Sequence, residues 1–374
     1  MQSFVDLDRC LGQVPGAVVT KLARVDIGRG REELFRNQLP ALLTELANRA
    51  RVTSITASSA LEGVVVADPA RAAAIISGKA TVLRTRSEQE FAGYRAALDY
   101  LFARDWRPLN VGLLLHLHRG LFAQTNTPGG QFKQTDNLVV DRSPDGLVEV
   151  RFVPVPAART EYYSVELIDC YNDAMAAHRH HPVLLTGLCV LDLLTIHPFA
   201  DGNGRVVRAL TSALLDDAGY TVGRYVSLEH LIAETADGYY EALLKSTHGW
   251  HERANDPWPW LYYFIDVLAR AYQRFEEGAA ADRSTGTKQD RVREYVTHHA
   301  PRIFKIADIR AALPGISDPT IRLALDQLKQ ESRVQPQGTG RTAAWVRTEP
   351  GGYYDSFGPK RMWPGGPEAE YADC

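Results

Sequence analysis

Residues 197–208 read HPFADGNGRVVR and combine residue types that could carry out phosphate chemistry. The unperturbed pKa of histidine lies near neutrality, so His197 is a candidate general base for an attacking hydroxyl. Asp201 offers carboxylate oxygens, the hard ligands that suit Mg²⁺. Arg205 and Arg208 are three residues apart, so on a helix they share one face and could hold phosphoryl oxygens together.

The elements around this stretch would position these groups. Residues 182–196, PVLLTGLCVLDLLTI, predict a buried helix that ends before Pro198, which cannot continue it. Gly202 and Gly204 let backbone N–H groups approach a ligand closely, and helical spacing resumes after them. The start of such a helix attracts anions, because its first N–H groups lack partners and its dipole adds positive charge. The stretch therefore predicts a phosphate site, in which Asn203 can donate to a further oxygen.

The alternative is that these residues are structural. A histidine after a core helix often belongs to the core, and DGNG by itself is a turn. A turn, however, requires neither two arginines nor a preceding histidine at fixed offsets. The clustering therefore favours the functional interpretation.

Composition narrows the classes of protein that fit. The chain of 374 residues is 45% hydrophobic and 23% charged with a net charge of −3, as in a globular protein of two or three domains without an obligate nucleic-acid or membrane signature. No run of apolar residues reaches the length of a membrane span, and no basic segment followed by an apolar one opens the chain. The four cysteines are scattered, which argues against a disulfide framework or a zinc site: Cys10, Cys170, Cys189 and Cys374. We expect a cytoplasmic protein with no membrane partner.

Helical spacing predominates along the chain. Apolar residues recur at intervals of three and four in residues 31–50, 87–104, 109–124, 159–179 and 257–277. The segment GGQFKQTDNLVVDRSPDGLVEVRFVPVP instead contains β-branched residues, glycines and a turn signal, which predict a small β-hairpin. Residues 278–287 are small and polar, as in a linker. Beyond them, residues 288–348 predict a winged helix-turn-helix, and residues 349–374 a loose tail.

The C-terminal module differs from the rest of the chain in charge. Residues 288–347 hold eleven Lys/Arg against six Asp/Glu, a net charge of +5, which leaves −8 for the remainder. A basic winged helix could bind DNA with Thr320 and Arg322 near the start of the helix that reads the groove and Arg341 on the wing. Winged helices also dock proteins, so the sequence leaves DNA binding and protein docking open.

Residues 197–208 resemble the signature of the Fic family, His-x-Phe-x-Asp/Glu-Gly-Asn-Gly-Arg-x-x-Arg, and fill every defined position. The resemblance implies an all-α Fic-type helical bundle with a small hairpin flap and a catalytic core over residues 109–277. It implies transfer of AMP from ATP to a protein hydroxyl, with His197 as the base and Asp201 as the Mg²⁺ ligand. Phe199 would anchor the loop, while phosphate binding falls to the glycine amides, Asn203 and the two arginines, Arg205 and Arg208.

Further segments fit the same family. Residues 129–140, GGQFKQTDNLVV, resemble the flap that aligns the target segment by strand addition, although Lys133 stands where an arginine is expected. FVPVPAART resembles the extended segment before the next helix. DGYYEALLKS resembles the region that lines the adenine pocket, with Tyr239 and Tyr240 as the lining residues. Two adjacent tyrosines can also be simply the core and the rim of a helix.

The N-terminal region, residues 1–108, contains SSALEG at residues 58–63, which resembles the family's inhibitory pattern Ser/Thr-x-x-x-Glu-Gly/Asn. Ser58 and Glu62 fall on one helical face, and Gly63 suits the position just past a helix end. A carboxylate near a helix C-terminus is mildly unfavourable, so Glu62 does not stabilise its own helix. The resemblance names Arg208 as its partner, in an ion pair that would occupy the group needed for the γ-phosphate. The alternative is a solvated surface glutamate.

The leading hypothesis is a self-inhibited protein adenylyltransferase that modifies Ser, Thr or Tyr hydroxyls of an unidentified protein and of itself. The same site could instead remove AMP, or use another donor such as UTP or CDP-choline. A rival from another class is a DNA-binding regulator with a non-catalytic, ligand-sensing Fic core. A homodimer that buries the inhibitory helix is a further expectation that the sequence leaves open.

Overall fold

The computed structural model describes most of the chain, and the described residues form two compact units, one up to Arg274 and one from Phe275 onward. The described residues are 2–38, 40–80, 82–103, 105–142, 148–283, 288–298, 300–313, 316–338 and 344–348. Both units are mostly helical, and each contains a small antiparallel sheet.

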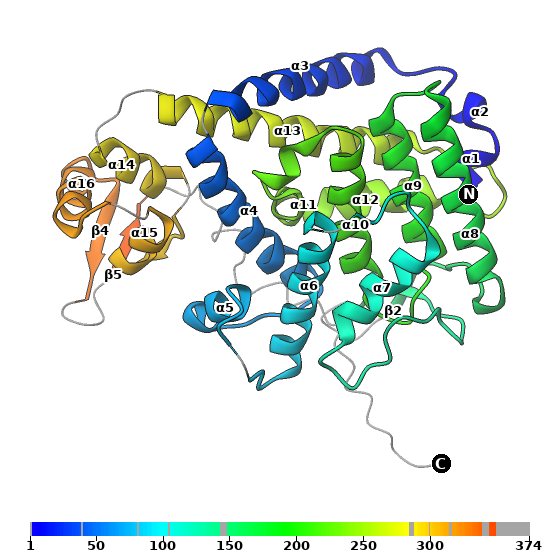
Figure 1. Cartoon of the computed structure of the whole chain (residues 1–374), viewed down its shortest axis with the longest axis horizontal. Coiled ribbons are helices and arrows are strands. Elements are labelled where there is room, and N and C mark those ends of the chain that lie inside the picture. Colours follow the sequence, from blue (N-terminus) through cyan, green and yellow to red (C-terminus); the bar gives the residue numbers. More distant parts are fainter. Residues whose placement is uncertain are drawn as a thin grey trace. The chain divides into compact units, whose positions relative to one another are not determined.

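The first unit is a helical bundle with one hairpin (Figure 1). Its helices are α1 (Gln2–Val5), α2 (Leu7–Leu11), α3 (Gly16–Gln38), α4 (Pro40–Leu61), α5 (Pro69–Ile76), α6 (Arg86–Ala103), α7 (Val111–Phe122), α8 (Ala157–Ala177), α9 (Pro182–Ile196), α10 (Asn203–Asp217), η1 (Thr221–Arg224), α11 (Leu228–Glu234), α12 (Ala236–Thr247) and the first part of α13 (Trp258–Arg283). The hairpin strands are β1 (Val139–Arg142) and β2 (Val148–Phe152).

Helix α9 forms the centre of this unit, and its bounds are those that the sequence predicts. All of its residues except Pro182 and Leu194 are buried, as expected of a helix that is apolar on every face. Helices α1, α8, α10 and α12 pack against it. A side chain at Gly187 would collide with α13, because a Cβ there would lie 2.7 Å from Leu261 Cδ2. Glycine at this position lets α13 close the bundle.

The one acidic residue of α9 holds the N-terminal segment in place. Asp192 is fully buried, and its Oδ1 accepts hydrogen bonds from Ser3 Oγ at 2.7 Å and from Trp250 Nε1 at 2.8 Å. Its Oδ2 accepts from the backbone N–H of Ser3 at 3.0 Å. A buried carboxylate must be compensated in this way, so α1 is tied to the core although it has only four residues.

Helix α4, which carries Ser58, is attached to the bundle by a buried carboxylate of α11. Glu229 accepts hydrogen bonds from Ser54 of α4 at 2.7 Å and from Tyr94 of α6 at 3.1 Å. Ser227 adds a third hydrogen bond at 3.2 Å. The network joins three helices, so it fixes α4 against the core beside the candidate site.

Two expectations about helix limits are corrected. Residues 31–50 form parts of two helices, since α3 ends at Gln38 and α4 starts at Pro40. Proline is well suited to the first position of a helix but not to its interior, and the spacing of apolar residues does not register this break. The expected linker is also partly helical, because α13 continues to Arg283 through an alanine-rich segment with high helix propensity. Residues 284–287 lie outside the described residues.

The hairpin forms where β-branched residues predicted it. Strands β1 and β2 pair antiparallel, with Val140 opposite Val150 and Arg142 opposite Val148. The turn signal SPDG falls on residues 143–146, which lie outside the described part of the chain. Strand β2 also contacts α12, so the hairpin extends over the helix that carries the two adjacent tyrosines.

The second unit has its own core. Helices α14 (Lys288–His298), α15 (Ile306–Ala312) and α16 (Asp318–Gln330) accompany a sheet in the order β3-β5-β4, made of β3 (Ile303–Phe304), β4 (Val334–Gln337) and β5 (Ala344–Arg347). Thr320 lies in the first turn of α16 and Arg322 is exposed on the same helix, whereas Arg341 lies outside the described residues. The winged helix-turn-helix assignment and the DNA-binding role stay predictions, and residues 349–374 lie outside the described range.

Helices that could cross a membrane are absent from the described residues, because none combines sufficient length with sufficient apolar character. Cys10, Cys170 and Cys189 are free thiols, and Cys374 lies outside the described part.

Candidate active site

The stretch 197–208 connects two core helices by a short loop. Helix α9 ends at Ile196, and His197 adopts a left-handed backbone with φ 53°. Gly202, with φ 78°, precedes the first residue of α10. A positive φ is costly for residues other than glycine, so the left-handed histidine is a strained position that its surroundings enforce. The helix–loop–helix arrangement predicted from Pro198 and the glycines is confirmed.

A backbone carbonyl fixes the tautomer of His197. Its ring is half-buried, and Nδ1 lies 3.2 Å from the carbonyl oxygen of Leu194. Only a protonated Nδ1 can donate to a carbonyl, so this contact leaves the lone pair on Nε2. Burial lowers the pKa of His197 to about 4, and the nearby Lys133 charge acts in the same direction. The imidazole is therefore neutral at physiological pH, with an unprotonated Nε2.

The loop is closed by side chains of its own and by the segment before the hairpin. Asn203 accepts from the Phe199 N–H at 2.9 Å and donates to the Phe199 carbonyl at 2.7 Å. Asn137 donates to the same carbonyl at 3.1 Å. Because Asn203 is only 2% exposed, its amide has a loop-closing role in the structure. Its predicted contact with phosphate stays a prediction.

Lys133, which stands in place of the expected arginine, fixes the backbone on both sides of His197. Its backbone N–H donates to the Pro198 carbonyl at 2.9 Å, and its Nζ donates to the Ile196 carbonyl at 3.3 Å. Nζ also donates to Asn137 Oδ1 at 2.8 Å. Burial lowers the pKa of Lys133 to about 8. The segment before the hairpin thus holds the loop that carries His197.

His118 of α7 supports the same loop and is not among the predicted site residues. Its ring stacks on Phe199 with centroids 3.8 Å apart, and its Nε2 lies 3.2 Å from the Asp201 carbonyl oxygen. Its Nδ1 accepts the Gly130 N–H at 2.9 Å, so the proton resides on Nε2. Burial lowers the pKa of His118 to about 4. The sequence signal was weak, because a histidine in an apolar helix is usually a core residue.

The pKa of His118 predicts an acid-dependent loss of stability. In the unfolded chain His118 has a pKa of about 6.5, whereas in the folded protein its pKa is about 4. Between these two pH values the unfolded chain binds more protons than the folded protein. The free energy of unfolding therefore falls as the pH is lowered through this window. Between about pH 7.5 and pH 5 the contribution is about 2 kcal/mol. Urea unfolding should show that His118→Phe, which keeps the stack on Phe199, loses about 2 kcal/mol less than wild type over this range.

The exposed His116 lies on the same helix, so His116→Phe is the matched control for exchanging a histidine of α7 for phenylalanine. Equal pH dependence in His118→Phe and wild type would contradict the assignment of a neutral, buried His118.

Asp201 supplies the carboxylate expected to hold Mg²⁺. Its side chain is 43% exposed, and Oδ1 accepts the Gly202 N–H at 2.6 Å. The described residues contain no cluster of three or more His, Cys, Asp or Glu side chains that could hold a metal on their own. One accessible carboxylate nevertheless fits Mg²⁺ that accompanies a nucleotide, because this ion binds through one or two carboxylates together with phosphates and water.

Arg205 faces the core rather than the loop's open side. It is 2% exposed, and its guanidinium is ion-paired with the buried carboxylate of Glu90 on α6 and lies over the ring of Phe122. Its NH2 is also 3.7 Å from Asp201 Oδ1. Spacing alone placed Arg205 on a face with Arg208, but the two side chains have different partners. A phosphate contact by Arg205 stays a prediction, and the observed contacts give it a positioning role.

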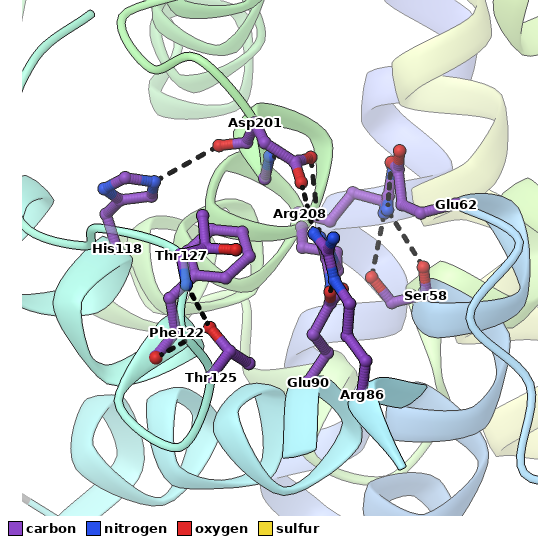
Figure 2. Close-up of polar contacts among 12 residues, drawn as sticks. Ser58, Glu62, Arg86, Glu90, His118, Phe122, Thr125, Thr127, Asp201 and Arg208 are labelled. Carbon is purple, nitrogen blue, oxygen red and sulfur yellow. Dashed lines mark hydrogen bonds and ion pairs between the residues drawn. The ribbon is translucent and has the colours of Figure 1, made fainter. Parts of the chain in front are cut away.

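Arg208 is enclosed by the segment that contains Ser58 and Glu62 (Figure 2). Its Nε donates to Ser58 Oγ at 2.9 Å, and its NH2 donates to the Ser58 carbonyl at 3.0 Å and to Glu62 Oε1 at 2.7 Å. Helix α4 ends at Leu61, and Gly63 has φ 72°, as its place past the helix end predicts. The two motifs, 146 residues apart, therefore meet in one ion pair.

The Glu62 carboxylate also lies against the first turn of α10. A Cβ at Gly204 would be 2.2 Å from Glu62 Oε1, so only glycine leaves room for this approach. Burial would raise the pKa of Glu62, but Arg208 and Arg205 more than offset it and lower the pKa. An ionised carboxylate thus occupies the helix N-terminus that was predicted to bind an anion.

The adjacent tyrosines have different environments. Tyr239 is 3% exposed and packs edge-on against Trp260, whereas Tyr240 is half-buried and has the Arg151 guanidinium 4.9 Å above its ring. Burial raises the pKa of both phenols. This is the division into core and rim that was the alternative to an adenine pocket, and nucleotide binding by the pair stays a prediction.

Comparison with known proteins shows what residues around this site are similar to. Residues 108–215 match the model of the Fic/DOC family. The "Protein adenylyltransferase Fic" of Drosophila grimshawi is 29% identical over 134 residues, which are 35% of this chain and 26% of that protein. The protein of the same name from Culex quinquefasciatus is 29% identical over 137 residues, 35% of this chain and 25% of the relative. The match thus spans about a quarter of the length of these relatives.

Solved structures of the family share the fold. A Fic family protein from Desulfovibrio desulfuricans aligns with a TM-score of 0.58 at 21% identity, covering 91% of this chain and 98% of that structure. A Fic domain containing signalling protein from Bacteroides thetaiotaomicron aligns with a TM-score of 0.55 at 20% identity, over 70% and 96% of the two chains. The loop that carries His197, together with these matches, shows that this chain contains a Fic domain with homology to the Fic protein adenylyltransferases.

Proposed function

We propose that this protein is an adenylyltransferase that transfers AMP from ATP to Ser, Thr or Tyr hydroxyls of a protein, itself included. The observation that carries the proposal is the juxtaposition of a neutral base and an anion site. His197 presents Nε2 at one end of the loop, and the first turn of α10 with Arg208 lies at the other. Homology to protein adenylyltransferases supports ATP as the donor and a protein as the target.

In this proposal, different residues of the loop and of α10 take up the proton, bind the phosphates and hold the metal ion. Nε2 of His197 accepts the proton of the target hydroxyl while the hydroxyl oxygen bonds to the α-phosphorus and the bond to the bridging oxygen breaks, releasing pyrophosphate. The α10 N-terminus and the Arg208 guanidinium bind phosphate oxygens and fix the α-phosphorus for in-line attack. Asp201 would hold Mg²⁺, which when bound neutralises charge on the phosphates.

In this proposal Glu62 inhibits the protein by taking the position of a phosphate. Arg208 is 4% exposed, so its charge needs an anionic partner, and leaving it unpaired would be costly. Glu62 satisfies Arg208 in the nucleotide-free protein, and a γ-phosphate would satisfy it in the active complex. Both cannot do so at once, so ATP that enters beside Glu62 has its α-phosphorus misaligned. Since the pKa of Glu62 is lowered, acidity in the neutral range does not release it.

The donor can be tested by intact-mass analysis of a Glu62→Gly variant. After incubation with Mg²⁺ and equal concentrations of ATP, UTP or CDP-choline, we expect a mass increase of one AMP from ATP and much less adduct from the other donors. The preference over CDP-choline is expected because Arg208 is freed to bind a γ-phosphate, and the preference over UTP is expected from the homology to protein adenylyltransferases. Asp201→Ala in the same background should lower the yield, since the carboxylate is the predicted metal ligand.

Three outcomes would contradict parts of the proposal. An adduct from UTP or CDP-choline alone would show a different transferase. Loss of AMP from a pre-labelled protein on addition of Mg²⁺, without any labelling by ATP, would indicate AMP removal. Absence of every adduct together with salt-sensitive binding of specific DNA by the second unit would favour the regulator. Homodimer formation stays a prediction.

A further inference from the structure

Arg86, at the start of α6, bridges two carboxylates at the edge of the site (Figure 2). Its Nε donates to Glu90 Oε1 at 2.5 Å, and its NH2 lies 3.4 Å from Asp201 Oδ2. The side chain is 44% exposed. Arg86 lies outside the Fic signature, and the function proposed above does not use it.

The bridge completes a cycle of alternating charges. Glu90 is 3% exposed and pairs with Arg205 as well as with Arg86, and Arg205 in turn approaches Asp201 Oδ1 at 3.7 Å. Two arginines thus balance two carboxylates. The pair of Arg205 and Glu90 is buried, whereas the pair of Arg86 and Asp201 is partly exposed to solvent.

The two oxygens of Asp201 have different partners. Oδ1 accepts a hydrogen bond from the Gly202 N–H and lies near Arg205, so its partners are within the loop and the first turn of α10. For Oδ2, the hydrogen bond within the part of the chain that the structure describes comes from Arg86. A divalent cation that coordinates Oδ2 therefore has to compete with the positive charge of the Arg86 guanidinium.

We propose that Arg86 is a tethered counter-ion that neutralises Asp201 in the metal-free protein and thereby sets the affinity of the site for divalent cations. The inference rests on the proposed function, because it takes Asp201 as the Mg²⁺ ligand. Arg86 can be displaced because its bond to Asp201 is long and partly exposed, and such pairs are weak. It also keeps its second bond, to Glu90 four residues along the same helix, so its release requires a movement of the guanidinium only.

Mn²⁺ titration of the nucleotide-free full-length protein tests this role directly, because it measures the weak affinity of the carboxylate itself, without the phosphates that would complete the site. Free Mn²⁺ is measured by electron paramagnetic resonance in wild type, Arg86→Ala and Arg86→Met, the last of which keeps most of the apolar stem. Removing a unit charge about 5 Å from a dication should tighten binding about tenfold in both variants at low ionic strength. The gain should shrink as NaCl is raised, because salt screens an exposed charge.

Two further variants make the result specific. Arg51→Ala removes another partly exposed arginine that is paired with an acid on α6, Asp99, and should leave Mn²⁺ affinity unchanged. Arg86→Ala combined with Asp201→Ala should not show the tighter Mn²⁺ binding, because the carboxylate that binds the ion is absent. The expected effect is tighter binding, which a misfolded variant would not produce. Equal Mn²⁺ affinity in wild type and both Arg86 variants, or no detectable binding in any of them, would overturn the proposal.

Failure of this inference can be told apart from failure of the proposed function. Tighter Mn²⁺ binding through Asp201, without AMP labelling by Glu62→Gly, would keep the counter-ion role and remove the transferase. AMP labelling by Glu62→Gly with unchanged Mn²⁺ affinity in the Arg86 variants would keep the transferase and remove the counter-ion role.

Discussion

Glu62→Gly should increase incorporation of label from α-labelled ATP into the protein by about a hundredfold, because a small misplacement of a reacting group costs a factor of this size. In wild type, Glu62 Oε1 lies 2.7 Å from Arg208 NH2 and against the first turn of α10, where phosphate would bind. Glycine at position 62 removes the carboxylate. Because α4 ends at Leu61 and Gly63 already has a left-handed backbone, the substitution lies outside the helix and should not shorten it. Arg208 then pairs with the nucleotide.

The second half of this experiment tests the base. Adding His197→Ala to Glu62→Gly should lower labelling by about a hundredfold to ten-thousandfold, the range that a positioned general base contributes. ATP binding, measured by calorimetry, should change little, since Nε2 serves the hydroxyl rather than the phosphates. Glu45→Ala, which removes a half-buried glutamate from the same helix α4, is the matched control and should leave the wild-type level unchanged.

Other results of this comparison would contradict the inhibitory role or the base. Equal labelling in wild type and Glu62→Gly would show that the ion pair with Arg208 does not restrain the reaction. Undiminished labelling in the double variant would show that another group takes the proton. A rise in Glu45→Ala as large as that in Glu62→Gly would indicate loosening of α4 rather than release of Arg208.

Asp192→Ala should lower the free energy of unfolding by about 3–5 kcal/mol, more than any other substitution considered above, because it leaves several buried donors without an acceptor. Asp192 is fully buried and accepts hydrogen bonds from the Ser3 backbone, the Ser3 hydroxyl and the Trp250 indole. The measurement is the free energy of unfolding from urea titration followed by tryptophan fluorescence. The same variant should expose the N-terminal segment, so limited proteolysis should cleave near α1 earlier than in wild type.

Two variants separate the hydrogen bonds from general packing. Asp192→Asn keeps one acceptor oxygen, so its loss should be smaller than that of Asp192→Ala. Ser3→Ala removes one donor at the other end and should cost about 1 kcal/mol, the usual net value of a single hydrogen bond. A loss below about 1 kcal/mol in Asp192→Ala would contradict the view that this carboxylate anchors α1.

Local features of the site were predictable from the sequence. The end of α9 before Pro198, the start of α10 after Gly202 and the glycine just past α4 follow from residues next to each other in the chain. Proline and glycine act on the backbone at their own positions, whatever the rest of the fold does. The same applies to the helical character of the bundle, because amphipathic spacing is a property of each segment.

The direction in which each side chain points was not predictable in this way. Spacing placed Arg205 and Arg208 on one face, but that face meets α6 on one side and α4 on the other, so Glu90 binds one arginine and Glu62 the other. Asn203 looked like a phosphate ligand, yet its amide closes the loop on Phe199. Helical periodicity tells which residues share a face and gives no information about what that face contacts.

The supporting residues carried almost no signal in the sequence. His118 lies in an apolar helix, and Arg86 and Glu90 form an i,i+4 pair such as many exposed helices contain. Their importance comes from Asp201, which is 83 residues from His118 and 115 residues from Arg86. The sequence by itself determined the loop, the histidine at its start and its two flanking helices, since these depend on neighbouring residues. Only the tertiary structure decided the partners of each charge, because burial and long-range packing bring those partners together.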